Sequence, residues 1–265
     1  NIFENRSWTS MKIGIINKPS LELMQCELTF LDRESIHYDI AMNQHAQYAD
    51  ALQQAGVDVH VFDKNQTSPD SVFVEDVAII LDELAIICSM GTPSRRGEID
   101  EMKKIISQFR DNIHQIRLPA TIEGGDVLRV GRTLYVGQSS RTNIDGIDAL
   151  IDIVSAFGYR VVPIGVYGCL HLKTGVTALS DDTLLINPNW IDVEHFNEYK
   201  LIEVAPDEPW AANVLRIDDY LITNAAFPET AKIIRSSGFD IHEIDISEFS
   251  KAEAGLTCMS LVFSA

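Results

Sequence analysis

The feature that most constrains the fold is an order of secondary structure that the sequence predicts four times. Each repeat contains two short apolar segments separated by a polar or glycine-containing turn, then a helical segment, then a further apolar segment. The turns lie near residues 82, 131, 181 and 218, so they are 49, 50 and 37 residues apart. A period in this range is typical of a chain built from one repeated supersecondary unit.

The segments of these repeats are predicted from apolar periodicity and from turn residues, such as Gly158 at the end of a helix. They are a hairpin within 72–88, a helix over 98–109 and a strand over 113–118; strands over 127–130 and 134–136, a helix over 143–157 and a strand over 160–164; a hairpin around 181–182, a helix over 193–198 and a strand over 201–204; and a hairpin around 218–219, a helix over 229–236 and a strand over 240–244.

The two ends of the chain supply the parts of a fifth repeat. Residues 12–16 form a predicted strand with no hairpin partner before it, and residues 258–263 form one with no partner after it. If they pair, a helix over 41–55 and a strand over 57–62 complete the unit. The predicted fold is therefore α/β, a five-bladed pseudo-symmetric α/β propeller of ββαβ-type units that forms one domain over residues 11–265. The alternative is an open α/β sandwich.

Composition narrows the range of partners. The 265 residues are 46% hydrophobic and 23% charged, with a formal net charge of −18 and a pI of about 4.6. This acidity disfavours nucleic acid and anionic membranes, which need basic patches, and is compatible with a small cationic substrate. No apolar segment approaches the ~18 residues of a membrane span. Residues 1–10, interpreted as an N-terminal extension or a cloning remnant, lack the apolar core of a secretory signal.

Four cysteines, Cys26, Cys88, Cys169 and Cys258, are widely spaced and show no metal-binding pattern. They predict neither a disulfide framework nor a structural metal site, and they fit a reducing, cytoplasmic setting.

An unusual acidic segment lies at residues 69–80, which are predicted to form a buried β-segment rich in valine and isoleucine. Glu75 and Asp76 interrupt its middle, and Asp70 lies near its start. Burying an ionised carboxylate without a partner costs several kcal/mol, so buried carboxylates are paired, protonated or functional. The segment is either an edge strand with both acids in water or part of an acidic pocket that binds a cation.

Three residues from different repeats have the chemistry of a nucleophilic site. Cys258 alone fits a small buried hydrophobe at the start of a strand, and His171, between leucines, fits a core histidine. Together with an acid they suggest a thiolate nucleophile, a histidine that moves protons and a carboxylate that orients it. Glu123 suits the last role because Gly124 and Gly125 let the backbone approach closely, although an acidic turn is the simpler alternative.

The remaining charged residues indicate the kind of substrate. Glu75 and Asp76 have the chemistry to hold a planar guanidinium by paired, charge-assisted hydrogen bonds. Arg95 and Arg141 have the chemistry to hold a carboxylate at the other end, although Arg95 next to Arg96 also fits a solvated helix start. Acids at one end and arginines at the other describe a pocket for an arginine-like zwitterion. An acidic pocket also disfavours a resting thiolate, which predicts that the thiol ionises when the cationic substrate binds.

Six motifs together resemble those of a known family, that of the dimethylarginine dimethylaminohydrolases. The resemblance extends from about residue 26 to residue 263, nearly the whole chain. The motifs are residues 70–76 (DSVFVED), 94–98 (SRRGE), 123–126 (EGGD), 141–143 (RTN), 171–175 (HLKTG) and 258–260 (CMS).

The resemblance implies a five-bladed α/β propeller of the guanidine-modifying superfamily (the pentein fold). It also implies hydrolysis of asymmetric dimethylarginine or monomethylarginine to citrulline and dimethylamine or methylamine, through a covalent cysteine intermediate and without a cofactor. Arginine deiminases and amidinotransferases share this chemistry and remain alternatives, but deiminases usually carry an additional helical domain. A non-catalytic arginine-binding protein is a third possibility, against which the intact cysteine, histidine and glutamate argue. A homodimer is compatible with the sequence.

The resemblance also implies a role for each site residue. Cys258 corresponds to the nucleophile, His171 to the general acid and base, and Glu123 to its orienting partner. Residues 21–37 correspond to the variable lid over the substrate. The residues that correspond to substrate contacts are Glu75 and Asp76 at the guanidinium, Asp70, Arg95 and Arg141 at the amino-acid end, and Leu28 and Ala252 through their main chains.

Overall fold

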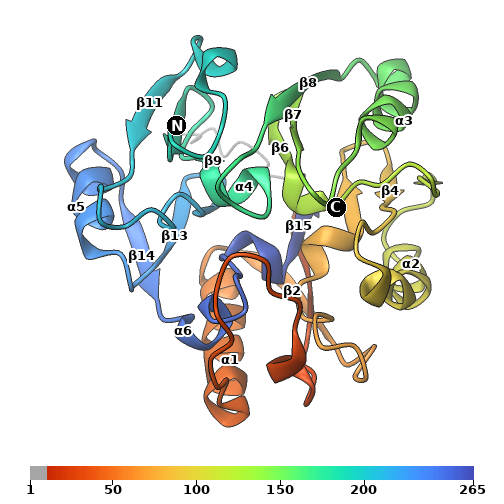
Figure 1. The fold of residues 1–265 in the computed structure, drawn as a ribbon, viewed down its shortest axis with the longest axis horizontal. Coiled ribbons are helices and arrows are strands. Elements are labelled where there is room, and N and C mark those ends of the chain that lie inside the picture. Colours follow the sequence, from red (N-terminus) through yellow and green to blue (C-terminus); the bar gives the residue numbers. More distant parts are fainter. Residues whose placement is uncertain (1–10) are drawn as a thin grey trace, which may run out of the picture.

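Five three-stranded sheets surround a central axis in the computed structural model, which describes residues 11–265 (Figure 1). In every sheet the middle strand pairs antiparallel with one neighbour and parallel with the other. A helix or a 3-10 turn connects the two parallel strands of each sheet. This is the ββαβ order expected from the sequence, and each such unit is one blade of the propeller.

The innermost strand of each blade is the one that pairs only antiparallel, because these strands line the central cavity. From the inner to the outer strand, the blades contain β3 (Ala78–Ile80), β4 (Ala85–Ile87) and β5 (Ile113–Gln115); β6 (Val127–Val130), β7 (Thr133–Gln138) and β8 (Arg160–Gly165); β9 (Val176–Ala178), β10 (Thr183–Ile186) and β11 (Lys200–Glu203); β12 (Leu215–Ile217), β13 (Tyr220–Asn224) and β14 (Ile241–Ile244); and β15 (Leu261–Ser264), β1 (Lys12–Asn17) and β2 (Val57–Phe62).

The helical segment predicted over 143–157 lies between the residues that cap it. Asn143 accepts a hydrogen bond from the Gly146 N–H at 2.8 Å, which caps the start of the second long helix, and Gly158, with a φ of 75°, terminates the segment. The α-helices are α1 (Tyr38–Gln54), α2 (Ile99–Ile106), α3 (Ile144–Val154), α4 (Leu172–Gly175), α5 (Pro228–Ser236) and α6 (Ser247–Ser250). The 3-10 turns are η1 (Leu23–Gln25), η2 (Val74–Val77), η3 (Pro93–Glu98), η4 (Gly124–Asp126), η5 (Ser155–Phe157), η6 (Val193–Phe196) and η7 (Thr257–Met259).

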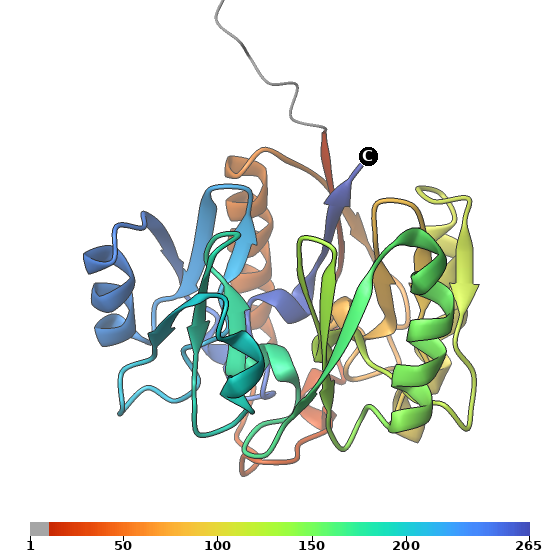
Figure 2. The same ribbon diagram turned by 90° about the horizontal axis from the view of Figure 1, so that it is seen from above.

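Chain closure occurs as predicted between the first and last strands. β1 and β15 pair antiparallel from Lys12 opposite Ser264 to Ile15 opposite Leu261, while β1 pairs parallel with β2. Figure 2 shows these two strands side by side. The blades therefore form a ring, and the open sandwich considered as an alternative is wrong.

The apolar core consists of clusters that lie between neighbouring blades. Ile99, Met102, Ile105 and Ile106 are buried on one face of α2, where they pack in a cluster with residues of β1, β4 and β15. Removing each such side chain from water stabilises the fold by ~1.5–3 kcal/mol. Because each cluster joins two blades, the blades hold one another in place.

Three predicted elements differ from the observed ones. Residues 69–77 are not a strand: η2 covers Val74–Val77, and only Ala78–Ile80 belongs to a sheet. Cys258 lies on η7 and not on the final strand, which begins at Leu261. The helix predicted over 193–198 is the 3-10 turn η6. A strand directs successive side chains to opposite faces of its sheet. In the first two cases a short helical turn instead lets adjacent side chains reach different partners.

The inner strands line a central cavity of about 550 Å³. Glu75, Lys173 and Thr257 also line it, and all three lie on the turns that precede inner strands. Among residues 11–265, none of the helices combines the length and the apolar character needed to cross a membrane.

Candidate active site

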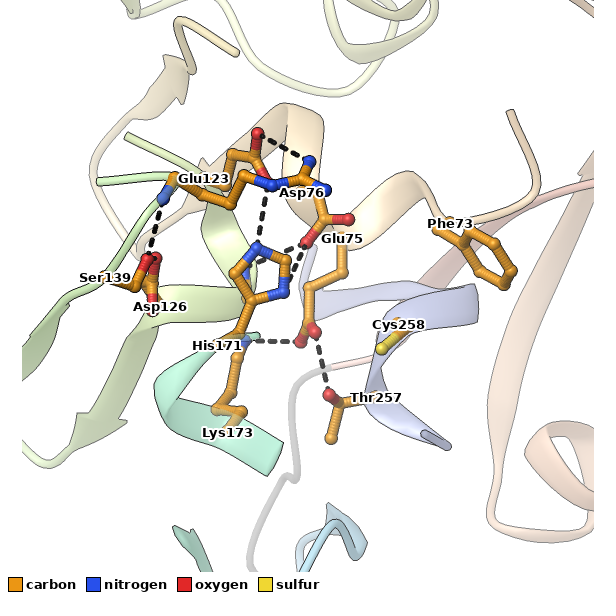
Figure 3. A network of polar contacts seen from close by, with 12 residues as sticks. Phe73, Glu75, Asp76, Glu123, Asp126, Ser139, His171, Lys173, Thr257 and Cys258 are labelled. Carbon is orange, nitrogen blue, oxygen red and sulfur yellow. Dashed lines mark hydrogen bonds and ion pairs between the residues drawn. The ribbon is translucent and has the colours of Figure 1, made fainter. Parts of the chain in front are cut away.

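The predicted catalytic residues lie on or beside short helical turns that directly precede inner strands. Glu123 directly precedes η4 before β6, His171 directly precedes α4 before β9, and Cys258 lies on η7 before β15. Glu75 and Asp76 lie on η2 before β3. Equivalent positions of four blades therefore bring these side chains close to one another, as Figure 3 shows.

Glu123 and His171 form a buried pair. Oε2 of Glu123 lies 2.8 Å from Nε2 of His171, and the glutamate is fully buried. Oε1 of the same carboxylate accepts a hydrogen bond from the Gly91 N–H at 3.0 Å and lies 3.6 Å from Nη1 of Arg141. The carboxylate is thus fixed on both sides, and it holds the imidazole in one orientation.

Two glycines after Glu123 allow this close packing. A Cβ atom on Gly124 would lie 2.0 Å from the Glu75 carbonyl oxygen, and one on Gly125 would lie 2.6 Å from Nδ1 of His171. No side chain larger than hydrogen fits at either position without displacing the backbone or the imidazole. The close approach predicted for these glycines is confirmed.

The surroundings of His171 favour the imidazolium form. The second carboxylate beside the ring belongs to Asp76, whose Oδ1 lies 3.7 Å from Nδ1. Burial alone would lower the imidazole's pKa, but the carboxylates of Asp76, Asp126 and Glu123 outweigh it and raise the pKa to about 9. The ring is therefore a cation at neutral pH, able to donate a proton.

Asp76 also belongs to a buried ion-pair network with Arg95. Nη1 of Arg95 lies 2.5 Å from Oδ2 of Asp76, and Nη2 lies 2.9 Å from Oε2 of Glu98. Burial would raise the pKa of Asp76, but His171 and Arg95 outweigh it and hold the pKa below its usual value. Arg95 is only 3% exposed, so its alternative reading as a solvated helix start is wrong, whereas Arg96 is exposed.

Glu75 has a partner that sequence reasoning did not assign. Its Oε1 pairs with the ammonium of Lys173, and its Oε2 accepts a hydrogen bond from Oγ1 of Thr257 at 2.7 Å. Burial raises the pKa of Glu75, and Lys173 opposes this rise. Glu75 and Asp76 are 8% and 4% exposed, so the reading of both as water-exposed edge residues is wrong. Nor do they form a free pair, because each already binds a protein cation.

Asn213, from the fourth blade, connects the histidine and cysteine turns and was missed as a site residue. Its side-chain amide donates to the Lys173 carbonyl oxygen at 3.0 Å and to Oγ1 of Thr257 at 3.1 Å. Its oxygen accepts the Thr257 N–H at 3.0 Å. Lys173 lies two residues after His171, and Thr257 directly precedes Cys258, so their positions in sequence could have identified them. No such sequence signal points to Asn213.

Cys258 is partly buried, and its thiol accepts a hydrogen bond from the Gly255 N–H at 3.3 Å. Burial raises the pKa of the thiol well above its usual range, and the carboxylates of Glu75 and Asp76 raise it further. This direction agrees with the expectation that an acidic pocket disfavours a resting thiolate. Among the described residues no hydrogen bond joins Cys258 to His171, and Figure 3 shows Glu75 between the thiol and the imidazole.

Asp126 is a further buried acid that organises the site from behind. Its Oδ2 accepts hydrogen bonds from Ser139 at 2.6 Å and Thr142 at 2.7 Å, and its Oδ1 accepts the Leu172 N–H at 2.9 Å. It therefore fixes the backbone immediately after His171. The sequence showed this aspartate within the EGGD motif but did not indicate its role.

The residues predicted for the amino-acid end of a substrate lie around this centre. Asp70 is buried, and its carboxylate accepts the Glu27 N–H at 3.2 Å. Burial raises the pKa of Asp70 to about 6 against the opposing charge of Arg95. Arg141 and Ala252 are also buried, and Leu28 is partly buried.

The acids around His171 include one group with the composition of a metal site. Asp76, Glu123 and His171 offer ligand atoms that lie within 4.8 Å of one another. However, the two carboxylates approach opposite nitrogens of the ring, and an arginine accompanies each of them. This arrangement suits an imidazolium between two anions better than a metal ion, which needs its ligands to converge on one point.

Fold and site together define a class. A ring of five ββαβ blades, with a cysteine, a histidine and several carboxylates on the turns around its axis, is the architecture of the guanidine-modifying α/β propellers.

Comparisons with known proteins give the family within this class. A family model described as "N,N dimethylarginine dimethylhydrolase, eukaryotic" matches residues 25–259. The N(G),N(G)-dimethylarginine dimethylaminohydrolase of Pseudomonas aeruginosa is 35% identical over 227 residues, which are 85% of this chain and 89% of that protein. The protein of the same name from Streptomyces coelicolor is 33% identical over 250 residues, 94% of this chain and 96% of that protein. The chain belongs to the dimethylarginine dimethylaminohydrolase family.

A solved structure supports the assignment of the fold. It is a cysteine-to-serine mutant of the Pseudomonas aeruginosa enzyme in complex with citrulline. It superimposes with a TM-score of 0.91 and 32% identity, covering 96% of this chain and 100% of that chain.

Proposed function

We propose that this protein hydrolyses Nω-methylated L-arginine, asymmetric dimethylarginine or monomethylarginine, to L-citrulline and dimethylamine or methylamine. The observation that carries the proposal is the arrangement of Cys258 and a cationic His171 around buried carboxylates at the centre of the ring. A thiol, a proton donor and anions that attract a guanidinium are the groups this reaction requires. The related Pseudomonas structure, named as a citrulline complex, supports the product.

Substrate recognition is assigned to the two ends of the site. Glu75 and Asp76 interact with the guanidinium end, where they already bind the cations of Lys173 and Arg95. Asp70, Arg95 and Arg141 are assigned to the amino-acid end. Arg95 reaches from there to the guanidinium end, because its Nη2 donates to the Asp70 carbonyl oxygen at 3.2 Å while its Nη1 binds the Asp76 carboxylate. Leu28 and Ala252 contribute main-chain contacts there.

The reaction proceeds in two halves. When the cationic substrate binds, the Cys258 thiol gives its proton to solvent water, and the thiolate Sγ attacks the guanidinium carbon. The tetrahedral adduct then breaks its C–N bond to the methylated nitrogen as His171 gives that nitrogen a proton. The amine leaves, and the remaining carbon stays bonded to sulfur. Water then attacks this carbon while the neutral His171 takes its proton. The C–S bond breaks, the hydroxyl proton of the adduct passes to the departing sulfur to restore the resting thiol, and citrulline is released.

The electrostatics of the free enzyme suit this sequence of steps. His171, with a pKa of about 9, is protonated at neutral pH and ready for the first half. The thiol is protonated because burial and the nearby acids raise its pKa. A bound guanidinium supplies a positive charge beside those acids, so we infer that thiol ionisation is coupled to substrate binding.

The test is citrulline release from asymmetric dimethylarginine, monomethylarginine and arginine in parallel, with Cys258→Ser as the control. We expect release from the methylated substrates and a loss of at least about 1,000-fold in the variant, since a serine hydroxyl is a much weaker nucleophile here. The variant should still bind substrate. Release from arginine alone would place the protein with the deiminases, the alternative reading of the sequence. No release from any of the three would refute the proposal.

We further infer that residues 11–265 act as one catalytic domain in the reducing cytoplasm, without cofactor, nucleic acid or membrane partner. All four cysteines are free in the structure, which supports such a compartment. For its assembly, a homodimer is compatible with the sequence. Residues 1–10, interpreted from the sequence as an extension or remnant, lie outside the described residues.

A further inference from the structure

Glu253 has an unusual backbone conformation and lies five residues before Cys258. Its φ is +59°, in the left-handed region that residues other than glycine seldom adopt. The residue is only 8% exposed. This conformation ends α6, because the Glu253 N–H donates to the Ser250 carbonyl oxygen and the Ala254 N–H to the Phe249 carbonyl oxygen, each at 3.1 Å, as in a left-handed helix C-cap.

The side chain of Glu253, in turn, binds the predicted lid. Oε1 of Glu253 accepts hydrogen bonds from three consecutive N–H groups, those of Thr29 at 2.8 Å, Phe30 at 2.5 Å and Leu31 at 2.7 Å. Consecutive N–H groups directed at one point form an anion-binding nest. Oε2 is buried and has no hydrogen-bond partner within residues 11–265, so the nest is what binds this carboxylate.

The nest lies directly beside Leu28, the residue predicted to contact substrate through its main chain. On the other side of Leu28, the Glu27 N–H donates to the carboxylate of Asp70 at 3.2 Å. Two buried carboxylates therefore hold the peptide groups on either side of Leu28. The side chains of residues 29–35 are exposed and contribute little packing to this part of the loop.

We infer that Glu253 is a positioning residue. It holds the main chains of Leu28 and Ala252 in the positions from which they contact the amino-acid end of the substrate. Its carboxylate fixes the segment that follows Leu28, and its own backbone continues directly from Ala252. One residue thus connects both predicted main-chain contacts across the site. The inference rests on the proposed function and adds to it a determinant of substrate affinity outside the reacting groups.

The experiment compares two substitutions at this position. Glu253→Gln keeps the size of the side chain but removes the charge, and Glu253→Gly removes the carboxylate while relieving the backbone strain. Glu248→Gln is the matched control. Glu248 is also buried and accepts a loop amide, the His37 N–H at 2.7 Å, but at the far end of the loop.

For both Glu253 variants we expect KM for asymmetric dimethylarginine to rise about 10-fold, with kcat changed less than about 3-fold, because charge-assisted hydrogen bonds to the loop are lost. Hydrogen exchange at the amides of residues 29–31 should accelerate about 10-fold or more. Glu248→Gln should change neither quantity.

Three results would overturn the inference: an unchanged KM in both Glu253 variants, an equal rise in KM in Glu248→Gln, or unchanged exchange at residues 29–31. The exchange measurement does not depend on turnover. If the parent protein released no citrulline, that result would refute the proposed function. The role of the nest would still be tested separately, because unchanged hydrogen exchange at residues 29–31 in the Glu253 variants would refute it.

Discussion

At the scale of single residues, the centre of the site is a buried cation between two anions. Glu123 and Asp76 approach opposite nitrogens of His171, and together with Asp126 they raise the pKa of the ring to about 9 against the effect of burial. The same acids disfavour the thiolate of Cys258. The free protein therefore holds the proposed proton donor, His171, charged and the proposed nucleophile, Cys258, neutral, which is the state that an incoming guanidinium would change.

The free energy of unfolding should contain a contribution from His171 that depends on pH. The pKa of about 9 in the folded state exceeds the unfolded value of ~6.5, so between these values the native state retains a proton that the unfolded state has lost. This contribution is fully present below about pH 6.5 and is lost as pH rises through about 9. His171→Gln should flatten the decline, as measured by urea unfolding of both proteins across this range.

His195, exposed on η6, supplies the control for that measurement. His195→Gln should leave the decline of the parent protein in place. An identical pH dependence in the parent and in His171→Gln would show that the imidazole is not held as a cation.

At the scale of elements, the site depends on short turns placed at the same point of successive blades. η2, η4, α4 and η7 each end where an inner strand begins. Such turns direct their side chains toward the site, and the strands that follow hold the backbone of each turn in place. Catalytic groups on rigid element ends keep their positions better than groups on long loops.

Gly125 and Gly131 provide a matched test of this arrangement. A Cβ atom on Gly125 would lie 2.7 Å from Oδ1 of Asp76 and closer still to the imidazole, whereas Gly131, with a φ of 58°, has no neighbouring atom within 4 Å. We expect Gly125→Ala to lower kcat/KM about 100-fold, since small displacements of catalytic groups have effects of that order. Gly131→Ala should lower the free energy of unfolding by ~1–2 kcal/mol through its left-handed conformation and leave activity unchanged.

Citrulline release and urea unfolding on both variants measure these effects. Equal losses of activity in the two proteins would mean that the loss reflects general destabilisation and not the geometry around His171.

At the scale of the whole molecule, the ring is closed by its two ends and reinforced between blades. The Ala265 N–H donates to the Met11 carbonyl oxygen at 2.8 Å, beyond the last pair of the β1–β15 ladder. Ion pairs connect neighbouring blades at their hairpin turns, for example Arg129 with Asp82 at 2.6 Å and Arg216 with Asp181 at 2.9 Å. Exposed pairs of this kind contribute at most ~1 kcal/mol each to the free energy of unfolding. The apolar clusters therefore supply most of the stabilisation between blades.

A ring whose ends lie side by side should tolerate circular permutation. We expect a protein with residues 265 and 11 joined by a short glycine-rich linker, and with new ends between Pro206 and Asp207, to fold and release citrulline, because both residues are exposed between two blades. A control opened between Ile222 and Thr223, inside β13, should not fold. Circular dichroism and citrulline release measure the folding and activity of both proteins. If the protein opened between Pro206 and Asp207 were as unstable as the one opened between Ile222 and Thr223, the prediction that the closed ring tolerates new ends would be wrong.

The sequence by itself determined the repeat and the ring and named the candidate site residues, because these follow from local patterns. Apolar periodicity and turn residues recur in each blade, and Cys258, His171 and Glu123 interrupt apolar segments at points where polar groups need a reason to be present. The main local errors concerned residues 69–77 and the start of the last strand, where apolar residues predicted strands. Short 3-10 turns form there instead, and they let Glu75 and Asp76 reach Lys173 and Arg95 and let Thr257 reach Glu75.

Only the tertiary structure decided which charges are partners. No sequence pattern pairs Glu75 with Lys173, places Asn213 between two catalytic turns, or directs three lid amides at Glu253. These residues lie between 40 and 224 positions apart in the chain, and each pair meets only because the ring closes. The physical reason is that burial makes every unpaired charge costly, so the partner is chosen by proximity in the folded ring and not by proximity in sequence.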